Sequence, residues 1–289
     1  MSIAIPKTEP APRVMPFRAA RPGKAGLSCL VALPPVISQS NAPLVAVHGI
    51  RRAAGDQVAC FAARAATQGR PVIAPLFDSE TWPRYQQVVR GKRADLALIA
   101  LLEALRDAGI WRTETVQIAG YSGGAQFAHR FALLHPHLVS RLSVASAGWF
   151  TFPDDAVFPY GFGRRPEPAR KDWGQLMAGG LDRFLTLPIQ VAVGSKDNRA
   201  DRNTRQGVEI DAQQGADRTT RAKRWVAALR TAAFARGLTT RIGLVVLPGC
   251  GHDFRRCVTK GGLDRLVLPD LASGAGALQA APYDQALAA

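Results

Sequence analysis

The chain has 289 residues, of which 47% are apolar and 20% are charged, and its net charge is +15. This balance indicates a globular protein with a large buried core and argues against a disordered chain. No apolar run is long enough for a membrane-spanning helix, and the first residues carry prolines and charges where a secretory signal would be apolar. We therefore expect a cytoplasmic protein that does not act in a membrane.

The positive charge is spread along the chain, mostly as arginines, with local clusters at 199–205 and 218–224. No run of five basic residues occurs, and aromatic residues are not interleaved with the charges. The pattern favours a solvated basic surface over a nucleic-acid-binding one, with an anionic substrate or surface as the alternative. Whether the protein is a monomer or a homodimer is left open by the sequence.

The four cysteines, Cys29, Cys60, Cys250 and Cys257, are too few and too scattered for a disulfide framework. Cys250 and Cys257 flank His252, which raises the question of a zinc site. The segment has no CxxC pair and no fourth ligand nearby, so we expect neither a metal site nor a cofactor.

Along the chain, residues 1–24 are rich in proline, arginine and alanine and predict a loose leader before a domain of residues 25–270. Short apolar runs predict strands, and amphipathic segments that end at glycine or before proline predict helices. The expected strands are 27–33, 43–49, 70–75, 115–120, 141–148, 187–194 and 240–249, and the expected helices are 56–68, 92–108, 124–134 and 220–236.

Strands that alternate with helices predict an α/β fold with a mostly parallel central sheet flanked by helices. Residues 150–186, rich in proline, glycine and aromatic residues, interrupt this alternation and predict a small irregular cap or lid. Residues 195–219 form a second irregular, polar segment. The Ala-rich residues 271–289 predict a loosely held tail.

The segment from Gly120 to Gly124 fits the pattern G-x-S-x-G and lies between a predicted strand and a predicted helix. In that context the pattern is typical of a strained turn that exposes a nucleophilic serine, here Ser122, at the carboxyl edge of the sheet. By itself the pattern is also compatible with a glycine-rich turn that contains an incidental serine.

A nucleophilic serine needs a base, and a histidine held by a carboxylate is the common solution. Among the five histidines, only His252 lies in a loop after a late strand, so it is the predicted base. Asp197, after the strand that ends at 194, is the predicted acid, and Asp201 and Asp253 are the alternatives. This gives the chain order serine, acid, histidine that accompanies the motif.

An oxyanion hole is expected from the backbone N–H groups of Gly123 and Ile50. Substrate-binding side chains are expected from Trp149 and Phe150, which follow a strand, together with Tyr121 beside the nucleophile and Trp82 on a neighbouring loop. For Trp149 and Phe150 the alternative is an anchoring role in the core. His48 is interpreted as packing beneath the oxyanion loop.

Arg218 and Arg221 lie one helical turn apart. They are candidates either for binding a substrate carboxylate or for pairing with acidic residues that fix the long loop at 195–219.

With these residues assigned, residues 27–265 resemble the α/β-hydrolase superfamily, and in particular bacterial cytoplasmic hydrolases similar to polyhydroxybutyrate depolymerases and small carboxylesterases. The resemblance depends on the sequences HGI and GYSGGA at 48–50 and 120–125, and on residues 146–154, 158–161 and 214–221. It implies hydrolysis of an ester or a similar acyl bond of a small or oligomeric substrate, through an acyl-enzyme and without a cofactor.

Three other functions are compatible with these motifs. The same residues serve lyase, haloperoxidase or carbon–carbon bond hydrolase chemistry on this fold. A catalytically silent binding module is the second alternative. A binder of polyanions or nucleic acid is the third, suggested by charge alone.

Overall fold

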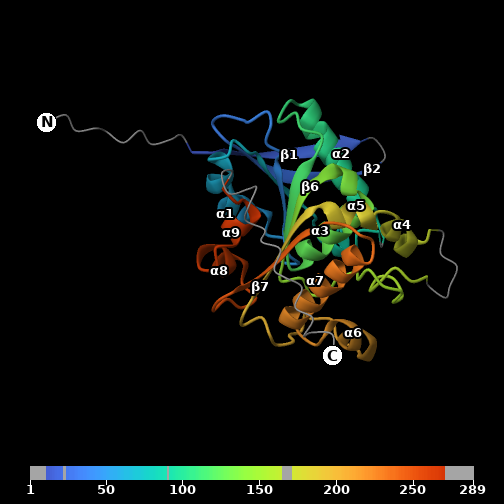
Figure 1. The fold of residues 1–289 in the computed structure, drawn as a ribbon. Coiled ribbons are helices and arrows are strands. Elements are labelled where there is room, and N and C mark those ends of the chain that lie inside the picture. Colours follow the sequence, from blue (N-terminus) through green and yellow to red (C-terminus); the bar gives the residue numbers. More distant parts are fainter. Residues whose placement is uncertain (1–10, 22–23, 90, 165–170, 271–289) are drawn as a thin grey trace.

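The structure is a computed structural model that describes residues 11–21, 24–89, 91–164 and 171–270. An eight-stranded sheet forms its centre, with the strand order β1-β2-β4-β3-β5-β6-β7-β8 (Figure 1). β1 pairs antiparallel with β2, and β2 pairs antiparallel with β4. All other neighbouring strands are parallel, as the sequence predicts. The strands are β1 (Arg13–Arg21), β2 (Lys24–Leu33), β3 (Leu44–Val47), β4 (Val72–Leu76), β5 (Val116–Tyr121), β6 (Val139–Ala145), β7 (Pro188–Gly194) and β8 (Arg241–Leu247).

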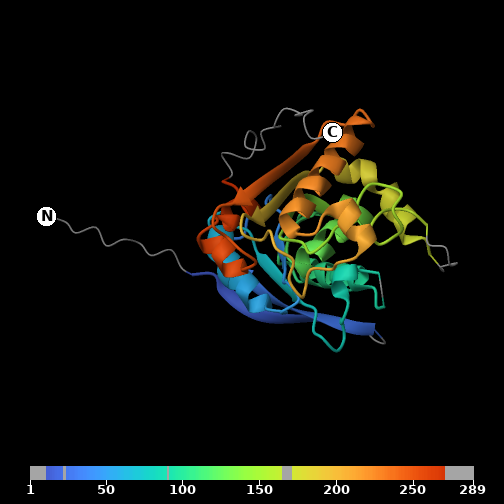
Figure 2. The ribbon, with the colours of Figure 1, turned by 90° about the horizontal axis from the view of Figure 1, so that it is seen from below.

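Helices cover both faces of the sheet (Figures 1 and 2). One face packs against α1 (Ala54–Ala66), α8 (Phe254–Thr259) and α9 (Leu263–Val267). The other face packs against α2 (Ala94–Asp107), α3 (Gly123–Leu134), α5 (Leu181–Thr186) and α7 (Arg218–Phe234). The remaining helices are α4 (Trp173–Gly179), α6 (Val208–Gln214) and the 3₁₀ turns η1 (Tyr85–Gln87) and η2 (Pro136–Leu138). None of the helices in these described ranges is both long and apolar enough to cross a membrane.

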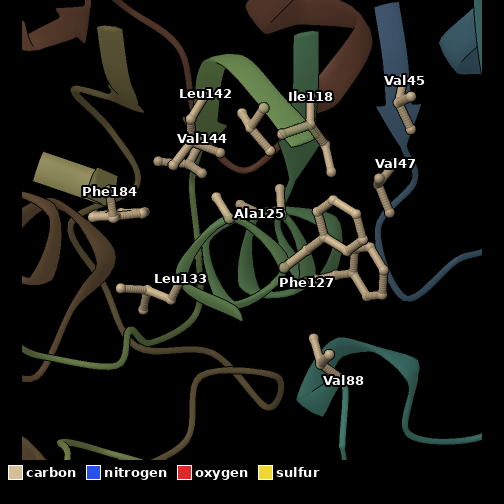
Figure 3. Packing of buried hydrophobic residues seen from close by; sticks show 14 of the residues in the cluster. Val45, Val47, Val88, Ile118, Ala125, Phe127, Leu133, Leu142, Val144 and Phe184 are labelled. Atoms are coloured by element: carbon tan, nitrogen blue, oxygen red, sulfur yellow. The ribbon is translucent and has the colours of Figure 1, made fainter. Parts of the chain in front are cut away.

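Helix α3 lies in the middle of the larger core. Every residue from Gly123 to Leu133 is buried. Phe127 and Ala125 of this helix face aliphatic side chains of β3, β5 and β6, and Val88, just after η1, and Phe184 of α5 close the core (Figure 3). Because the helix is packed on all sides, the turn that precedes it is held rigidly.

Residues 13–21 correct the sequence prediction of a loose leader. They form β1, the edge strand next to β2. Met15, Phe17 and Ala19 alternate along it and pack against the core, whereas Pro16 and Arg18 are exposed. This period of two is the signature of a half-buried strand, but the proline and arginine content conceals it. Residues 1–10 of the expected leader lie outside the described residues.

The two segments expected to be irregular contain short helices. Within 150–186, α4 and α5 pack against α3, and Phe184 of α5 is fully buried. Residues 165–170 of the expected cap lie outside the described residues. Within 195–219, α6 packs against α7. Helices of six or seven residues show too little periodicity to be recognised by pattern alone. The tail expected at 271–289 also lies outside the described residues.

Candidate active site

Ser122 lies at a strained turn between β5 and α3. Its backbone dihedrals are φ 55° and ψ −116°, a conformation that non-glycine residues rarely adopt. The neighbouring backbone segments are so close that a Cβ atom on Gly120 would lie 2.2 Å from the carbonyl oxygen of Gly124. One on Gly124 would lie 2.1 Å from the carbonyl oxygen of Val47. The glycines of the motif are therefore required by close packing, and they hold the serine at the carboxyl edge of the sheet.

Ser122 is joined to His252 and Asp197 by a continuous chain of hydrogen bonds. The Ser122 hydroxyl donates to Nε2 of His252 at 3.0 Å, and Nδ1–H of His252 donates to Oδ2 of Asp197 at 2.8 Å. The three residues follow the parallel strands β5, β7 and β8, whose carboxyl ends lie at the same edge of the sheet. Asp197 is only 3% exposed, whereas the His252 side chain is 24% exposed. The histidine can thus accept the serine proton while one of its sides faces solvent.

The carboxyl group of Asp197 is held in its ionised form. Burial raises its pKa, but the hydrogen bond and charge of His252, the charge of Arg218 and the Ser146 hydroxyl outweigh this effect, and the pKa lies below its ordinary value. Arg218 donates to the other carboxylate oxygen, Oδ1, at 3.1 Å. An ionised carboxylate fixes the Nδ1–H tautomer of His252, which leaves Nε2 free to accept a proton.

The two alternative acids have other partners. Asp201 forms two hydrogen bonds with Arg218 and lies next to this arginine rather than the histidine. Asp253 accepts a hydrogen bond from the N–H of Arg256 at 2.8 Å and caps helix α8. Only Asp197 among the three acids considered contacts the ring of His252.

The loop after β3 closely approaches the nucleophile. A Cβ atom on Gly49 would lie 3.4 Å from Cβ of Ser122, and one on Gly123 would lie 3.4 Å from the backbone nitrogen of Ile50. The backbone nitrogen atoms of Ile50 and Gly123, the first residue of α3, therefore lie near each other beside the serine. At that point the partial positive charge of the helix N-terminus also favours an anion.

His48 supports this loop from below, as the sequence suggests. Its Nε2 accepts a hydrogen bond from the N–H of Phe77 at 3.1 Å, and its Nδ1–H donates to the carbonyl of Gly49 at 2.8 Å. Burial lowers the pKa of His48 to about 4, so the ring is neutral. Tyr85, which the sequence analysis did not single out, donates to the carbonyl of His48 at 2.6 Å. Tyr85 belongs to a 3₁₀ turn with no recognisable motif, so pattern alone could not have indicated it.

The four predicted substrate-binding residues are distributed between the site and the core. Tyr121 is buried in the smaller core next to His252, with its ring 5.3 Å from that of the histidine and its hydroxyl facing Sγ of Cys257. Phe150 is 1% exposed and stacks on Trp225 at 4.4 Å, which is the anchoring position that the sequence analysis gave as the alternative. Trp82 is buried against Phe77, with the ring centroids 6.0 Å apart.

Trp149 covers a buried arginine that the sequence analysis overlooked. The guanidinium of Arg130 lies 3.9 Å from the centroid of the Trp149 ring. This arginine also donates to Thr151 and to the carbonyl of Gln86, both at 2.9 Å. It connects α3 to η1 and to the loop after β6. Its position within an apolar helix gave no indication of this role.

The group of Cys250, His252 and Cys257 is arranged differently from a metal site. Both ring nitrogens of His252 are engaged with Ser122 and Asp197. The two thiols face backbone carbonyls of Arg256 and Gly251. Across the described residues, no group of three or more histidine, cysteine or acidic side chains has the arrangement needed to hold a metal ion.

Comparisons with known proteins give matches among solved structures. No protein-family model and no curated protein sequence matches the chain. Poly(aspartic acid) hydrolase-1 from Sphingomonas sp. KT-1 is similar, with 24% identity, a TM-score of 0.74 and coverage of 89% of this chain and 99% of that chain. The LpqC poly(3-hydroxybutyrate) depolymerase from Bordetella parapertussis matches with 24% identity, a TM-score of 0.71 and coverage of 91% and 92%.

An S-formylglutathione hydrolase from Agrobacterium tumefaciens matches less well, with 16% identity, a TM-score of 0.53 and coverage of 88% of this chain and 92% of that chain. The three matches extend over most of each chain. The sheet and its flanking helices are therefore an arrangement that several solved hydrolases share.

Proposed function

We propose that this chain, which has the α/β-hydrolase fold, is a serine hydrolase that cleaves a carboxylic ester or a related acyl bond. The observation that carries the proposal is the hydrogen-bond chain from Ser122 through His252 to Asp197, at a strained turn between a buried strand and a buried helix. A neutral serine hydroxyl is a weak nucleophile, and this chain is the usual means of activating it.

In the proposed reaction, Nε2 of His252 takes the proton of Ser122 as the serine oxygen attacks the substrate carbonyl carbon. Asp197 stabilises the imidazolium that forms and keeps the ring in place. His252 then gives the proton to the leaving group, and an acyl-enzyme remains on Ser122. His252 takes a proton from a water molecule as the water attacks this acyl group, and it returns the proton to the Ser122 oxygen as the bond to the acyl group breaks and the acid product leaves.

The tetrahedral intermediate carries a negative charge on its oxygen. We assign the stabilisation of this oxyanion to the N–H groups of Ile50 and Gly123. The closeness of the two nitrogen atoms to each other beside Ser122 supports the assignment. Loss of one such donor typically costs about 3 kcal/mol of transition-state stabilisation. The loop that carries Ile50 is supported from the other side. Tyr85 donates to the carbonyl oxygen of His48, and Arg52 donates to the carbonyl oxygens of Phe77 and Asp78.

Two of the similar structures are enzymes named for polymers, poly(aspartic acid) and poly(3-hydroxybutyrate). Both polymers contain repeated acyl bonds, one an amide and the other an ester. This supports acyl transfer as the reaction class, and it makes oligomeric esters sensible first substrates beside small p-nitrophenyl esters.

A fluorophosphonate probe tests the nucleophile without knowledge of the substrate. We expect the wild-type protein to be labelled at one serine and to hydrolyse p-nitrophenyl esters. Ser122→Ala is expected to abolish labelling and to reduce hydrolysis by at least about 10³-fold, because the nucleophile is lost. Circular dichroism and thermal unfolding would check that the variant is folded. Full labelling of folded Ser122→Ala would refute the assignment.

A further inference from the structure

Arg218, the first residue of α7, connects the acid of the site to a second carboxylate. Its side chain is 1% exposed. Nη1 donates to Oδ1 of Asp197 at 3.1 Å and to Oδ2 of Asp201 at 3.1 Å, and Nη2 donates to Oδ1 of Asp201 at 2.9 Å. Arg218 therefore donates to Asp201 from two nitrogens and to Asp197 from one.

The second carboxylate is itself firmly held. The N–H of Asn203 and the hydroxyl of Thr204 donate to Oδ1 of Asp201 at 2.8 and 3.0 Å. The hydrogen bond from Arg218, these two bonds and the charge of the arginine lower the pKa of Asp201, even though partial burial opposes them. Asp201 is consequently an anion in the folded protein near neutral pH.

The summed charge of Asp197, Arg218 and Asp201 affects how well the protonated ring of His252 is stabilised. A buried arginine in contact with Asp197 alone would cancel much of the negative charge that stabilises the imidazolium. Asp201 supplies a second negative charge, so that the group of Asp197, Arg218 and Asp201 carries a net charge of −1. Low-dielectric surroundings make such pairing strong.

We propose that Arg218 and Asp201 form a positioning pair, which orients Asp197 and sets the net charge that it presents to His252. The inference rests on the proposed hydrolase function of Ser122, His252 and Asp197. Neither member of the pair contacts the reacting atoms, so both act through Asp197.

Other groups near His252 and Asp197 contribute less charge. Burial raises the pKa of Tyr121 far above its ordinary value and that of Cys257 to about 12, so both are neutral in the assay range. Asp253 is committed to capping α8, and Lys196, next to Asp197 in the chain, is exposed to solvent. The charges nearest to the acid are therefore those of the buried Arg218 and the half-exposed Asp201.

The test is the rate constant of fluorophosphonate labelling, measured from pH 5 to 9 in wild type, Asp201→Asn and Arg218→Met. Removing the negative charge of Asp201 leaves an excess positive charge, which disfavours the imidazolium. The acidic limb of the profile should therefore move to lower pH, by about 0.5 to 1 pH unit. Removing the positive charge of Arg218 should move this limb to higher pH by a similar amount. Arg218→Lys should restore much of the wild-type profile.

Asp211→Asn is a matched control. Asp211 pairs at 2.7 Å with Arg221, a second buried arginine of the same helix, and its side chain is 32% exposed, close to the 40% of Asp201. Its contacts do not include Asp197 or His252, so its profile should match that of wild type.

The outcomes separate the inference from the proposed function. Opposite shifts in Asp201→Asn and Arg218→Met, with none in Asp211→Asn, would support the positioning pair. An unshifted limb in folded Asp201→Asn would overturn it, even if Arg218→Met failed to fold. Wild-type protein that is not labelled at all would instead overturn the proposed hydrolase function, and the positioning role with it.

Discussion

His48 shows how a single residue couples the site to the stability of the fold. In the folded protein the ring is neutral and accepts the N–H of Phe77, and burial lowers its pKa from 6.5 to about 4. The unfolded chain therefore binds a proton between these two values that the folded protein does not bind. The stabilising contribution is complete above pH 6.5, and it is lost progressively as the pH falls towards 4.

The corresponding variant is His48→Gln, whose side-chain oxygen can accept the same hydrogen bond without titrating. In the wild type, we expect His48 to account for a loss of about 2 kcal/mol in the free energy of unfolding between pH 7 and pH 5. Urea denaturation at the two pH values should show that this difference is smaller by about that amount in the variant. If wild type and variant lose equal stability, His48 is not the buried neutral histidine described here.

At the scale of single residues, the sequence indicated those candidate site residues that can be assigned from their order along the chain. Ser122, Asp197 and His252 were identified by their positions after strands, and the structure brings them within hydrogen-bond distance. The surroundings of Phe150 could not be predicted in this way. Whether an aromatic ring after a strand lines a pocket or stacks on Trp225 depends on packing between distant segments.

Among the elements, the turn from β5 into α3 depends on the absence of side chains. Gly124→Ala would place a Cβ atom 2.1 Å from the carbonyl oxygen of Val47, and neither backbone can move without disturbing the core. We expect a loss of about 3 kcal/mol or more in the free energy of unfolding, together with loss of fluorophosphonate labelling.

Gly179→Ala is the control for this substitution. Gly179 ends α4, and a Cβ atom there would meet nothing within 4 Å. Alanine favours a helix over glycine, so this variant should be as stable as wild type or slightly more stable in urea denaturation. Equal stability of the two alanine variants would contradict the close approach of β3 and α3.

Elements marked by an apolar run or by a long amphipathic pattern were predictable, and short helices were not. The strands β2 to β8 and the helices α1, α2, α3 and α7 lie within a few residues of their expected positions. β1 was missed because arginine and proline on its solvent face outweighed the alternation of Met15, Phe17 and Ala19. The short helices α4, α5 and α6 form because the core beside α3 and α7 supports them, which no local pattern expresses.

For the whole molecule, the net charge of +15 has a kinetic consequence. A positive field attracts anionic esters and leaves neutral esters unaffected, and salt screens it. We expect kcat/KM for the half-ester p-nitrophenyl succinate to fall about threefold or more between 20 and 500 mM NaCl, whereas kcat/KM for p-nitrophenyl butyrate changes little. Equal salt dependence of the two substrates would show that the charge does not guide substrates to the site.

The position of β8 at one edge of the sheet bears on how the site is assembled during translation. Ser122 lies in the middle of the sheet, but its partner His252 follows it by 130 residues and lies in the loop after the edge strand β8. Because a domain generally folds as a unit, the serine can acquire its base only once β8 and the loop after it have been synthesised. Until then the serine lacks its base. The proposed hydrolase would therefore become reactive only after the edge strand joins the sheet, so that an incompletely synthesised chain does not react through Ser122.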